Sequence, residues 1–202
     1  MAAREAVRAG GGIELRHFLS EVRRRRRGPG SADTPFISVL HVDDLGVVAW
    51  REARHYRPST PGIAACATEI LVSLLNPRKF RATVIPSRYP MVECSAEFGV
   101  FKAHVHAYGV LALLQQPLVR AQIAPLGRGT SSSRRRIEPE DVLRVLVPHW
   151  DPATFAGVGE EVKEALESQA EAEAQLLLCY SVSSPSESSS PTESSALSAA
   201  RS

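Results

Sequence analysis

The chain has 202 residues, of which 44% are hydrophobic and 23% are charged. This length allows one domain with a sizeable core plus extensions, and it excludes two domains of ordinary size. The formal net charge of +2 is unevenly distributed, because residues 160–178 carry six glutamates and one lysine and residues 181–202 carry two glutamates and one arginine. Residues 1–158 therefore carry +8, which favours a polyanionic partner.

The cysteines and the N-terminal segment indicate the compartment. Cys66, Cys94 and Cys179 form no C-x-x-C pair, so the sequence predicts neither a disulfide framework nor a zinc site. The N-terminal segment has no apolar core of a signal peptide, and no apolar run approaches the length of a membrane span. We therefore expect a soluble, cytoplasmic protein with no membrane segment.

The first half of the chain predicts a leader followed by strands. Residues 1–12 end in three glycines and are expected to be a flexible leader, and a short helix is expected over 15–24. The five arginines of 23–27 repel one another, so this run should stay solvated unless an anion neutralises it. Apolar and β-branched runs bounded by turn residues predict strands at 36–42, 47–50, 69–75, 80–85 and 92–102.

The second half predicts helices around one long loop. Apolar residues of 107–123 have helical spacing, and Pro117 should kink this helix or divide it. Further expected elements are a loop at 127–136, a short helix at 139–143, a strand at 144–147 and a helix at 159–178. The last 22 residues contain eleven serines and are expected to be disordered.

These elements predict a mixed α/β protein of the α+β class. It should have a single domain with a twisted, mostly antiparallel sheet, flanking helices and a short C-terminal helix. The expected divisions are a flexible leader (1–12), the domain (13–152), a short helical segment (153–180) and a serine-rich tail (181–202).

The segment 127–136 suits contact with phosphate. Gly127 and Gly129 permit backbone conformations that other residues resist, and the serines between 131 and 133 offer hydroxyls and amides to an anion. The arginines at its end add bidentate donors that match phosphate oxygens or the acceptor edge of guanine. Taken alone, such a loop is more often a solvated surface loop whose arginines pair with nearby carboxylates.

The sequence shows no catalytic apparatus. His104 and His106 lack an evident third ligand for a metal, and the acidic pair Asp43 and Asp44 is explained by turn chemistry. The glycines form neither a phosphate-binding loop nor a dinucleotide-binding turn. We expect no metal and no cofactor. Basic residues are more numerous at predicted strand ends and loops, where Tyr56 and Tyr89 could stack on a base.

Three segments together resemble a known family. They are residues 70–79 (ILVSLLNPRK), residues 93–101 (ECSAEFGVF), and the helix, Gly-Thr-Ser loop and Arg-Ile-x-Pro-Glu-Asp turn that run to Val147 and Pro148. In order and spacing they are similar to the target recognition domain of the DNA specificity subunit of type I restriction-modification systems. The resemblance covers about residues 35–150, with a looser match over 13–34.

The resemblance implies a recognition subunit and no enzymatic activity of its own. In that family the domain recognises one half of a bipartite sequence in double-stranded DNA. Partner modification subunits bind S-adenosylmethionine and methylate adenine, and restriction subunits translocate and cleave. Base contacts would select the sequence, and arginine–phosphate contacts would give register and a salt-dependent affinity. The expected DNA-binding residues are Arg78, Lys79, Arg81, Arg88, Arg128, Thr130, Ser131, Ser132, Arg134, Arg135 and Arg136.

The sequence departs from the family pattern after the domain. Full specificity subunits have two recognition domains joined by long helical spacers, whereas this chain has one domain and a short acidic helix. The usual P-P-L-x-E-Q entry to the spacer is replaced by Pro-His-Trp-Asp-Pro at 148–152. Two interpretations follow. The chain is a half-subunit that dimerises, or it is a truncated or repurposed interaction and regulatory module that docks through the acidic helix at 159–178.

Overall fold

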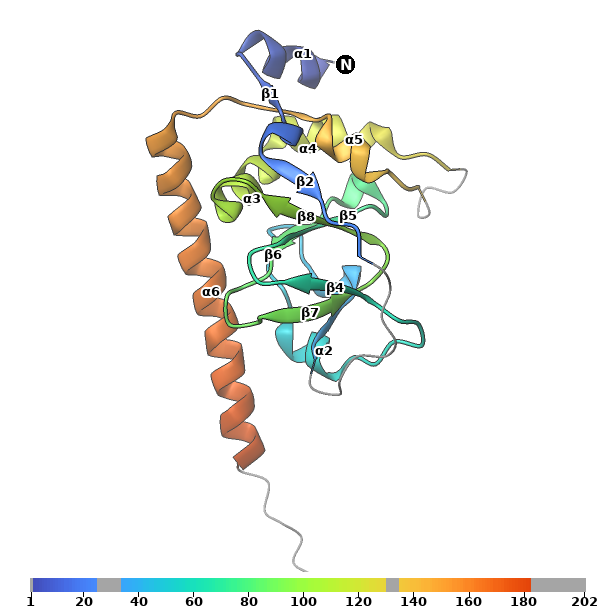
Figure 1. Ribbon diagram of the computed structural model, residues 1–202, viewed down its shortest axis with the longest axis vertical. Helices are drawn as coiled ribbons and strands as arrows, with labels where there is room; N and C mark the ends of the chain where they lie inside the picture. Colours follow the sequence, from blue (N-terminus) through green and yellow to red (C-terminus); the bar gives the residue numbers. More distant parts are fainter. Residues whose placement is uncertain (1, 25–33, 130–134, 183–202) are drawn as a thin grey trace, which may run out of the picture.

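The computed structural model describes residues 2–24, 34–129 and 135–182 (Figure 1). The expected serine-rich tail (181–202) lies outside these residues except for residues 181 and 182, which end the final helix. Helices are α1 (Ala2–Ala9), α2 (Trp50–His55), α3 (Ala107–Gln115), α4 (Pro117–Ile123), α5 (Pro139–Leu143) and α6 (Pro152–Val182). Short 3-10 turns are η1 (Leu15–His17), η2 (Val39–His41), η3 (Pro77–Lys79) and η4 (Ala124–Leu126).

The strands form three sheets within the described residues. They are β1 (Ile13–Glu14), β2 (Leu19–Glu21), β3 (Phe36–Ile37), β4 (Ile63–Cys66), β5 (Ile70–Ser73), β6 (Ala82–Val84), β7 (Met91–Cys94), β8 (Phe98–Ala103) and β9 (Leu146–Val147). The four-stranded sheet has the order β2-β8-β5-β6, the three-stranded sheet has the order β3-β7-β4, and β1 pairs with β9. Every pair is antiparallel except β3 with β7. The protein is therefore a mixed α+β fold, as expected.

The four-stranded sheet lies between two hydrophobic clusters. Side chains alternate between the two faces of a strand, so Ile70 and Val72 of β5 join one cluster and Leu71 joins the other. The first cluster contains residues of α3 and α4, and the second contains residues of α2, β4 and β7. Burial on both faces explains why the sequence of β5 is apolar without alternation.

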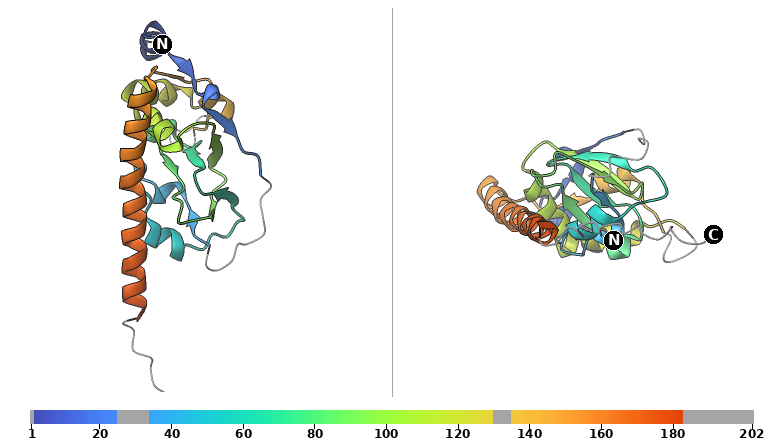
Figure 2. Two further views of the ribbon diagram at one scale, coloured as in Figure 1. Left: turned by 60° about the vertical axis from the view of Figure 1, so that its left-hand side comes forward. Right: turned by 90° about the horizontal axis from the view of Figure 1, so that it is seen from below.

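Helix α6 has 31 residues and is therefore about 46 Å long. It runs along one side of the domain and packs mainly on α3 and also on α2 (Figure 2). Its inward positions recur every three or four residues, which is the spacing of one helix face. They include Phe155, Gly159, Val162, Leu166, Ala170 and Ala174.

The approach of α3 and α6 depends on two glycines. A Cβ atom on Gly109 of α3 would lie 2.7 Å from the ring of Phe155, and one on Gly159 of α6 would lie 2.5 Å from Nδ1 of His106. Neither distance is compatible with a larger side chain unless the neighbour moves. The glycines thus let the two helices pack more closely than other residues would allow.

The acidic residues of α6 contact the domain itself. The carboxylate of Glu167 accepts hydrogen bonds from the Ser87 backbone N–H at 2.9 Å, from the Ser87 hydroxyl at 3.0 Å and from the Tyr108 hydroxyl at 2.5 Å. Burial raises the pKa of Tyr108, and its hydrogen bond to Glu167 raises it further. Glu160, Glu171 and Glu173 contact His106, Arg88 and the backbone N–H of Arg51, respectively. Four of the six glutamates are therefore engaged within the chain.

The structure corrects several expectations for the N-terminal third. Residues 2–9 form α1, where a flexible leader is expected. The helix expected at 15–24 is wrong, because β1, η1 and β2 occupy this segment and β2 pairs with β8. The strand expected at 36–42 is confirmed only for Phe36–Ile37, since Ser38 then caps η2. The segment expected as a strand at 47–50 contributes only an isolated bridge before α2 begins.

Expectations for the later elements are closer to the structure. The helix expected at 107–123 is divided where Pro117 predicts, into α3 and α4. The expected strand at 92–102 is two strands in different sheets, β7 and β8, and β4 has no counterpart among the sequence predictions. The C-terminal helix is present and longer than expected, because it begins at Pro152.

Candidate nucleic-acid interface

A short rigid turn presents two cations to solvent. Asn76 adopts a left-handed conformation (φ 50°), its carbonyl accepts a hydrogen bond from the Lys79 backbone N–H at 2.8 Å, and buried Pro77 and Phe80 anchor both ends of η3. Asparagine tolerates this conformation better than most residues with a Cβ atom. Arg78 and Lys79 are exposed, and neither side chain has an ion pair or a hydrogen bond within the described parts of the chain.

A hollow of about 400 Å³ opens beside this turn. Arg81 and Arg120 are held in its wall, because Arg81 Nη1 donates to the Val39 carbonyl at 2.8 Å and Arg120 Nη1 donates to the Asp44 carbonyl at 3.4 Å. The hollow is lined by Asp43, Asp44, Arg78, Lys79, Phe80, Arg81 and Arg120. Four cations therefore face two carboxylates, which gives the hollow a net positive charge.

The base of the segment 127–136 lies next to η3. Arg128 and Arg136 form an antiparallel bridge, with N–H to carbonyl distances of 2.8 and 2.9 Å. The backbone then continues the edge of β5, since the Asn76 N–H donates to the Arg135 carbonyl at 2.8 Å. A Cβ atom on Gly127 would lie 2.8 Å from Pro77, so this glycine permits the close contact with η3.

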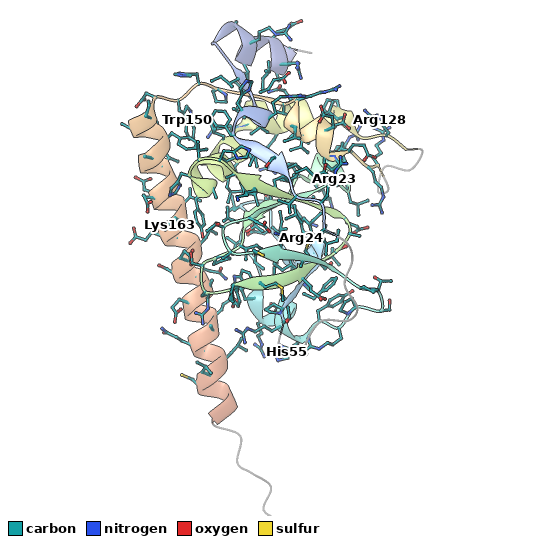
Figure 3. The ribbon with its side chains drawn as sticks, viewed as in Figure 1. Arg23, Arg24, His55, Arg128, Trp150 and Lys163 are labelled. Atoms are coloured by element: carbon teal, nitrogen blue, oxygen red, sulfur yellow. The ribbon has the colours of Figure 1, made fainter. Side chains whose placement is uncertain are left out.

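The side chains at this base are exposed and paired. Arg128 bonds to Asp141 at 3.0 Å, and Arg136 bonds to Glu97 at 3.3 Å. Surface pairs of this kind contribute only about 0–1 kcal/mol, so either arginine can exchange its carboxylate for a phosphate at small cost. Figure 3 shows Arg128 near one edge of the molecule, opposite Lys163 on α6. Arg135 is half-buried, and its Nε lacks a hydrogen-bond partner within the described residues.

The remaining predicted residues are placed differently. Thr130, Ser131, Ser132 and Arg134 lie outside the described residues. Arg88 faces α6, where its guanidinium pairs with Glu171 and lies 5.5 Å from the centre of the Tyr89 ring. The structure thus brings together Arg78, Lys79, Arg81, Arg128, Arg135 and Arg136 on neighbouring elements, and it separates Arg88 from them by its contact with α6.

Of the two tyrosines considered for base stacking, Tyr89 is buried and Tyr56 is exposed. Tyr89 is buried and stacks on Trp50 with ring centres 4.0 Å apart, so its faces are not accessible to a base. Tyr56 is 43% exposed, although one part of its ring packs against Phe36 and His41. Sequence reasoning missed Arg120, whose position on a helix after Pro117 gave no signal that it would reach the turn at Asp44.

The described residues show no site for metal chemistry or a membrane span. No group of three histidine, cysteine or acidic side chains among them is arranged to hold a metal ion. No helix in the described part is long and apolar enough to cross a membrane. Burial raises the pKa of Cys94 to about 12, which leaves this thiol protonated and unreactive at neutral pH.

Comparison with known proteins places the fold. No family model and no curated protein matches the sequence. The structure is similar to the HsdS subunit from Thermoanaerobacter tengcongensis, with a TM-score of 0.53, 15% identity, and coverage of 90% of this chain and 51% of that chain. It is also similar to the type IIG restriction endonuclease BpuSI, with a TM-score of 0.53, 10% identity, and coverage of 81% and 28%.

These similarities establish the fold and no more. The identities are low, and the chain spans about half the length of the HsdS subunit and less than a third of BpuSI. The fold expected from the sequence resemblance is therefore supported: this α+β domain has the architecture found in HsdS subunits.

Proposed function

We propose that this chain is a non-catalytic DNA-recognition module of a restriction-modification system. It binds double-stranded DNA in a sequence-specific manner and directs a partner adenine methyltransferase, with or without a restriction subunit, to the target. The observation that carries this proposal is the surface where Arg78 and Lys79, without acidic partners in the described chain, adjoin the paired Arg128 and Arg136. The fold shared with an HsdS subunit supports it.

The geometry suits contact with a DNA backbone. Each arginine or lysine that neutralises a phosphate releases condensed counterions, so affinity falls as salt rises. Within the described residues Arg78 and Lys79 have no ion pair to lose on binding DNA, whereas the exposed Arg128 and Arg136 exchange the partly buried carboxylates of Asp141 and Glu97 for phosphates. The rigid base of η3 and the bridge at 127–136 would hold these groups in fixed register. Backbone contacts of this kind orient the protein while other residues select the sequence.

The partners follow from the proposal. The modification subunit supplies S-adenosylmethionine chemistry, so this chain needs no cofactor, and the complex works on DNA in the cytoplasm. Two copies of this domain would recognise both halves of a bipartite site. A gene for an adenine methyltransferase beside the gene for this chain would support the assignment. The second candidate, a repurposed module that docks through its acidic helix, is less favoured because four of that helix's glutamates contact the domain itself.

Salt-dependent binding to duplex DNA tests the proposal. We expect the wild-type chain, with its modification subunit present, to bind duplex DNA at low salt, with log K falling linearly in log salt. The double variant Arg78→Ala/Lys79→Ala should reduce the magnitude of this slope by about 1.8, since each phosphate contact contributes about 0.9. Fluorescence anisotropy with a labelled duplex measures both quantities.

A charge-matched control separates contact from net charge. Arg8 on α1 and Arg51 on α2 are also exposed, and they lie on helices at opposite ends of the domain in Figure 1. Arg8→Ala/Arg51→Ala should leave the slope within about 0.3 of wild type. Absence of duplex binding by the wild-type complex at low salt would refute the proposed function. Equal slopes for the two double variants would remove η3 from the interface.

A further inference from the structure

The hairpin formed by residues 42–48 has a rigid tip. Val42 and Val48 form an antiparallel bridge, and Asp43 Oδ1 accepts hydrogen bonds from the backbone N–H groups of Leu45 at 2.9 Å and of Val47 at 2.8 Å. Gly46 has φ +91°, and a Cβ atom there would lie 2.6 Å from the Ala82 carbonyl. The tip is thus fixed by its own hydrogen bonds and by close contact with β6. Turn chemistry accounts for Asp43 and Gly46.

It does not account for the two residues between them. The carboxylate of Asp44 has no ion pair within the described residues, although it lines the same hollow as four cations. Leu45 exposes 71% of its surface and belongs to neither hydrophobic cluster. The backbone of Asp44 is held by Arg120, so both side chains project from a fixed position at the rim of the basic hollow.

We infer that Asp44 and Leu45 contact base edges in the DNA major groove while the neighbouring hollow holds a backbone phosphate. This inference rests on the proposed DNA-binding function and adds the residues that select sequence. A protruding tip can enter a groove, and the hollow can receive the phosphate that protrudes beside the groove. Its cations come from η3, from Arg81 just before β6, and from α4.

The chemistry of the two side chains defines what they select. A carboxylate is repelled by phosphate, but it accepts a hydrogen bond from the N4 amino group of cytosine in the major groove. An exposed apolar side chain at the same depth contacts the C5 methyl group of thymine. Leu45 is exposed and could be covered by DNA or by a protein partner. The basic residues around the tip favour DNA. We therefore expect adjacent preferences for cytosine and thymine in the target.

Selection of bound duplexes from a randomised library tests the inference. Asp44→Asn and Leu45→Ala both change exposed side chains and should leave the fold intact. Asp44→Asn should reduce discrimination at one cytosine position by roughly tenfold, and Leu45→Ala should do so at a neighbouring thymine position. Replacement of that thymine by uracil, which lacks the methyl group, should weaken binding by wild type and leave Leu45→Ala unaffected.

The controls and outcomes separate this inference from the proposed function. Glu164→Gln and Leu176→Ala change similar exposed residues on α6 and should select the wild-type motif. If Asp44→Asn and Leu45→Ala also select the wild-type motif, the inference is overturned, and the tip becomes a surface for a protein partner. If the wild-type complex binds no duplex at all, the proposed function itself fails. If the wild-type complex binds duplex DNA but selects no motif, DNA binding is retained as a function and this inference is overturned.

Discussion

Removal of the Arg24 side chain should destabilise the domain far more than removal of its neighbour. Arg24 Nη1 and Nη2 donate to the two carboxylate oxygens of Glu69 at 2.5 and 2.7 Å, and Nη1 also donates to the Ala64 carbonyl at 3.0 Å. The side chain of Glu69 is only 9% exposed and that of Arg24 is 29% exposed. Without Arg24, the buried carboxylate of Glu69 keeps the hydrogen bond from the Cys66 backbone N–H but loses its cationic partner.

The expected magnitude follows from this burial. Breaking a buried pair by removing one partner costs about 3–5 kcal/mol, and the partial exposure of Arg24 places Arg24→Ala near the lower value, at about 3 kcal/mol. Arg23 provides the matched control, because its side chain is 86% exposed and pairs with Glu21 at the surface. Arg23→Ala should leave the midpoint of urea denaturation close to that of the wild type.

Urea denaturation followed by circular dichroism measures both variants. A second substitution sharpens the test: adding Glu69→Gln to Arg24→Ala removes the unpaired charge and keeps an acceptor for the Cys66 N–H. It should restore about 1 kcal/mol or more of the lost stability. The reasoning is refuted if Arg24→Ala is as stable as Arg23→Ala, or if Glu69→Gln gives no recovery in the Arg24→Ala background.

Two further predictions concern the hairpin tip and α6. Gly46→Ala should cost about 1–3 kcal/mol in the free energy of unfolding, because it combines a positive φ with a 2.6 Å contact to the Ala82 carbonyl; a thermal melt unchanged from wild type would argue against a rigid tip. Partial burial alone would raise the pKa of Glu167, but hydrogen bonds from Tyr108 and Ser87 outweigh it and hold the pKa below its ordinary value of 4.5. The stability that Glu167 contributes is therefore complete above about pH 4.5 and is lost as pH falls through the lower folded-state pKa. Hydrogen exchange of α6 amides should show this loss in wild type, and a Glu167→Gln variant with the same acid dependence would contradict it.

Elements with strong local signals were predictable from the sequence. Pro117 has no backbone N–H to donate to the preceding turn, so a helix is interrupted at this residue. Helix α3 ends just before it and α4 begins with it. The apolar run at 69–75 contains β5, because burial on both faces needs only a continuous hydrophobic stretch. In these cases the residues that decide the structure lie within the element.

Elements decided by distant partners were not predictable. The segment 15–24 has mixed apolar spacing, and its strands form because β8 and β9 offer backbone partners. At 36–42 the β-branched composition is overridden by Ser38, whose backbone N–H donates to His41 Nδ1 at 3.1 Å and whose hydroxyl accepts from the Leu40 N–H at 3.4 Å. Composition describes a tendency, and a single cap can reverse it.

The candidate site shows the same division. That Arg78 and Lys79 would be exposed follows from the turn signal of Asn76 and Pro77. Nothing near Arg88 in the sequence indicates that a glutamate more than eighty residues later on α6 would neutralise it. The position of Arg120 beside Asp44 likewise depends on packing between α4 and the 42–48 hairpin.

The pairing of β1 with β9 brings the two ends of the domain together. Ile13 lies opposite Val147, so the chain enters and leaves the domain at adjacent points. Strand partners have Cα atoms only about 5 Å apart. A host polypeptide could therefore carry this domain as an insertion and keep its own flanking residues almost in place. Helix α6 would have to accompany the domain, because Leu166 and Ala170 of this helix complete the two hydrophobic clusters.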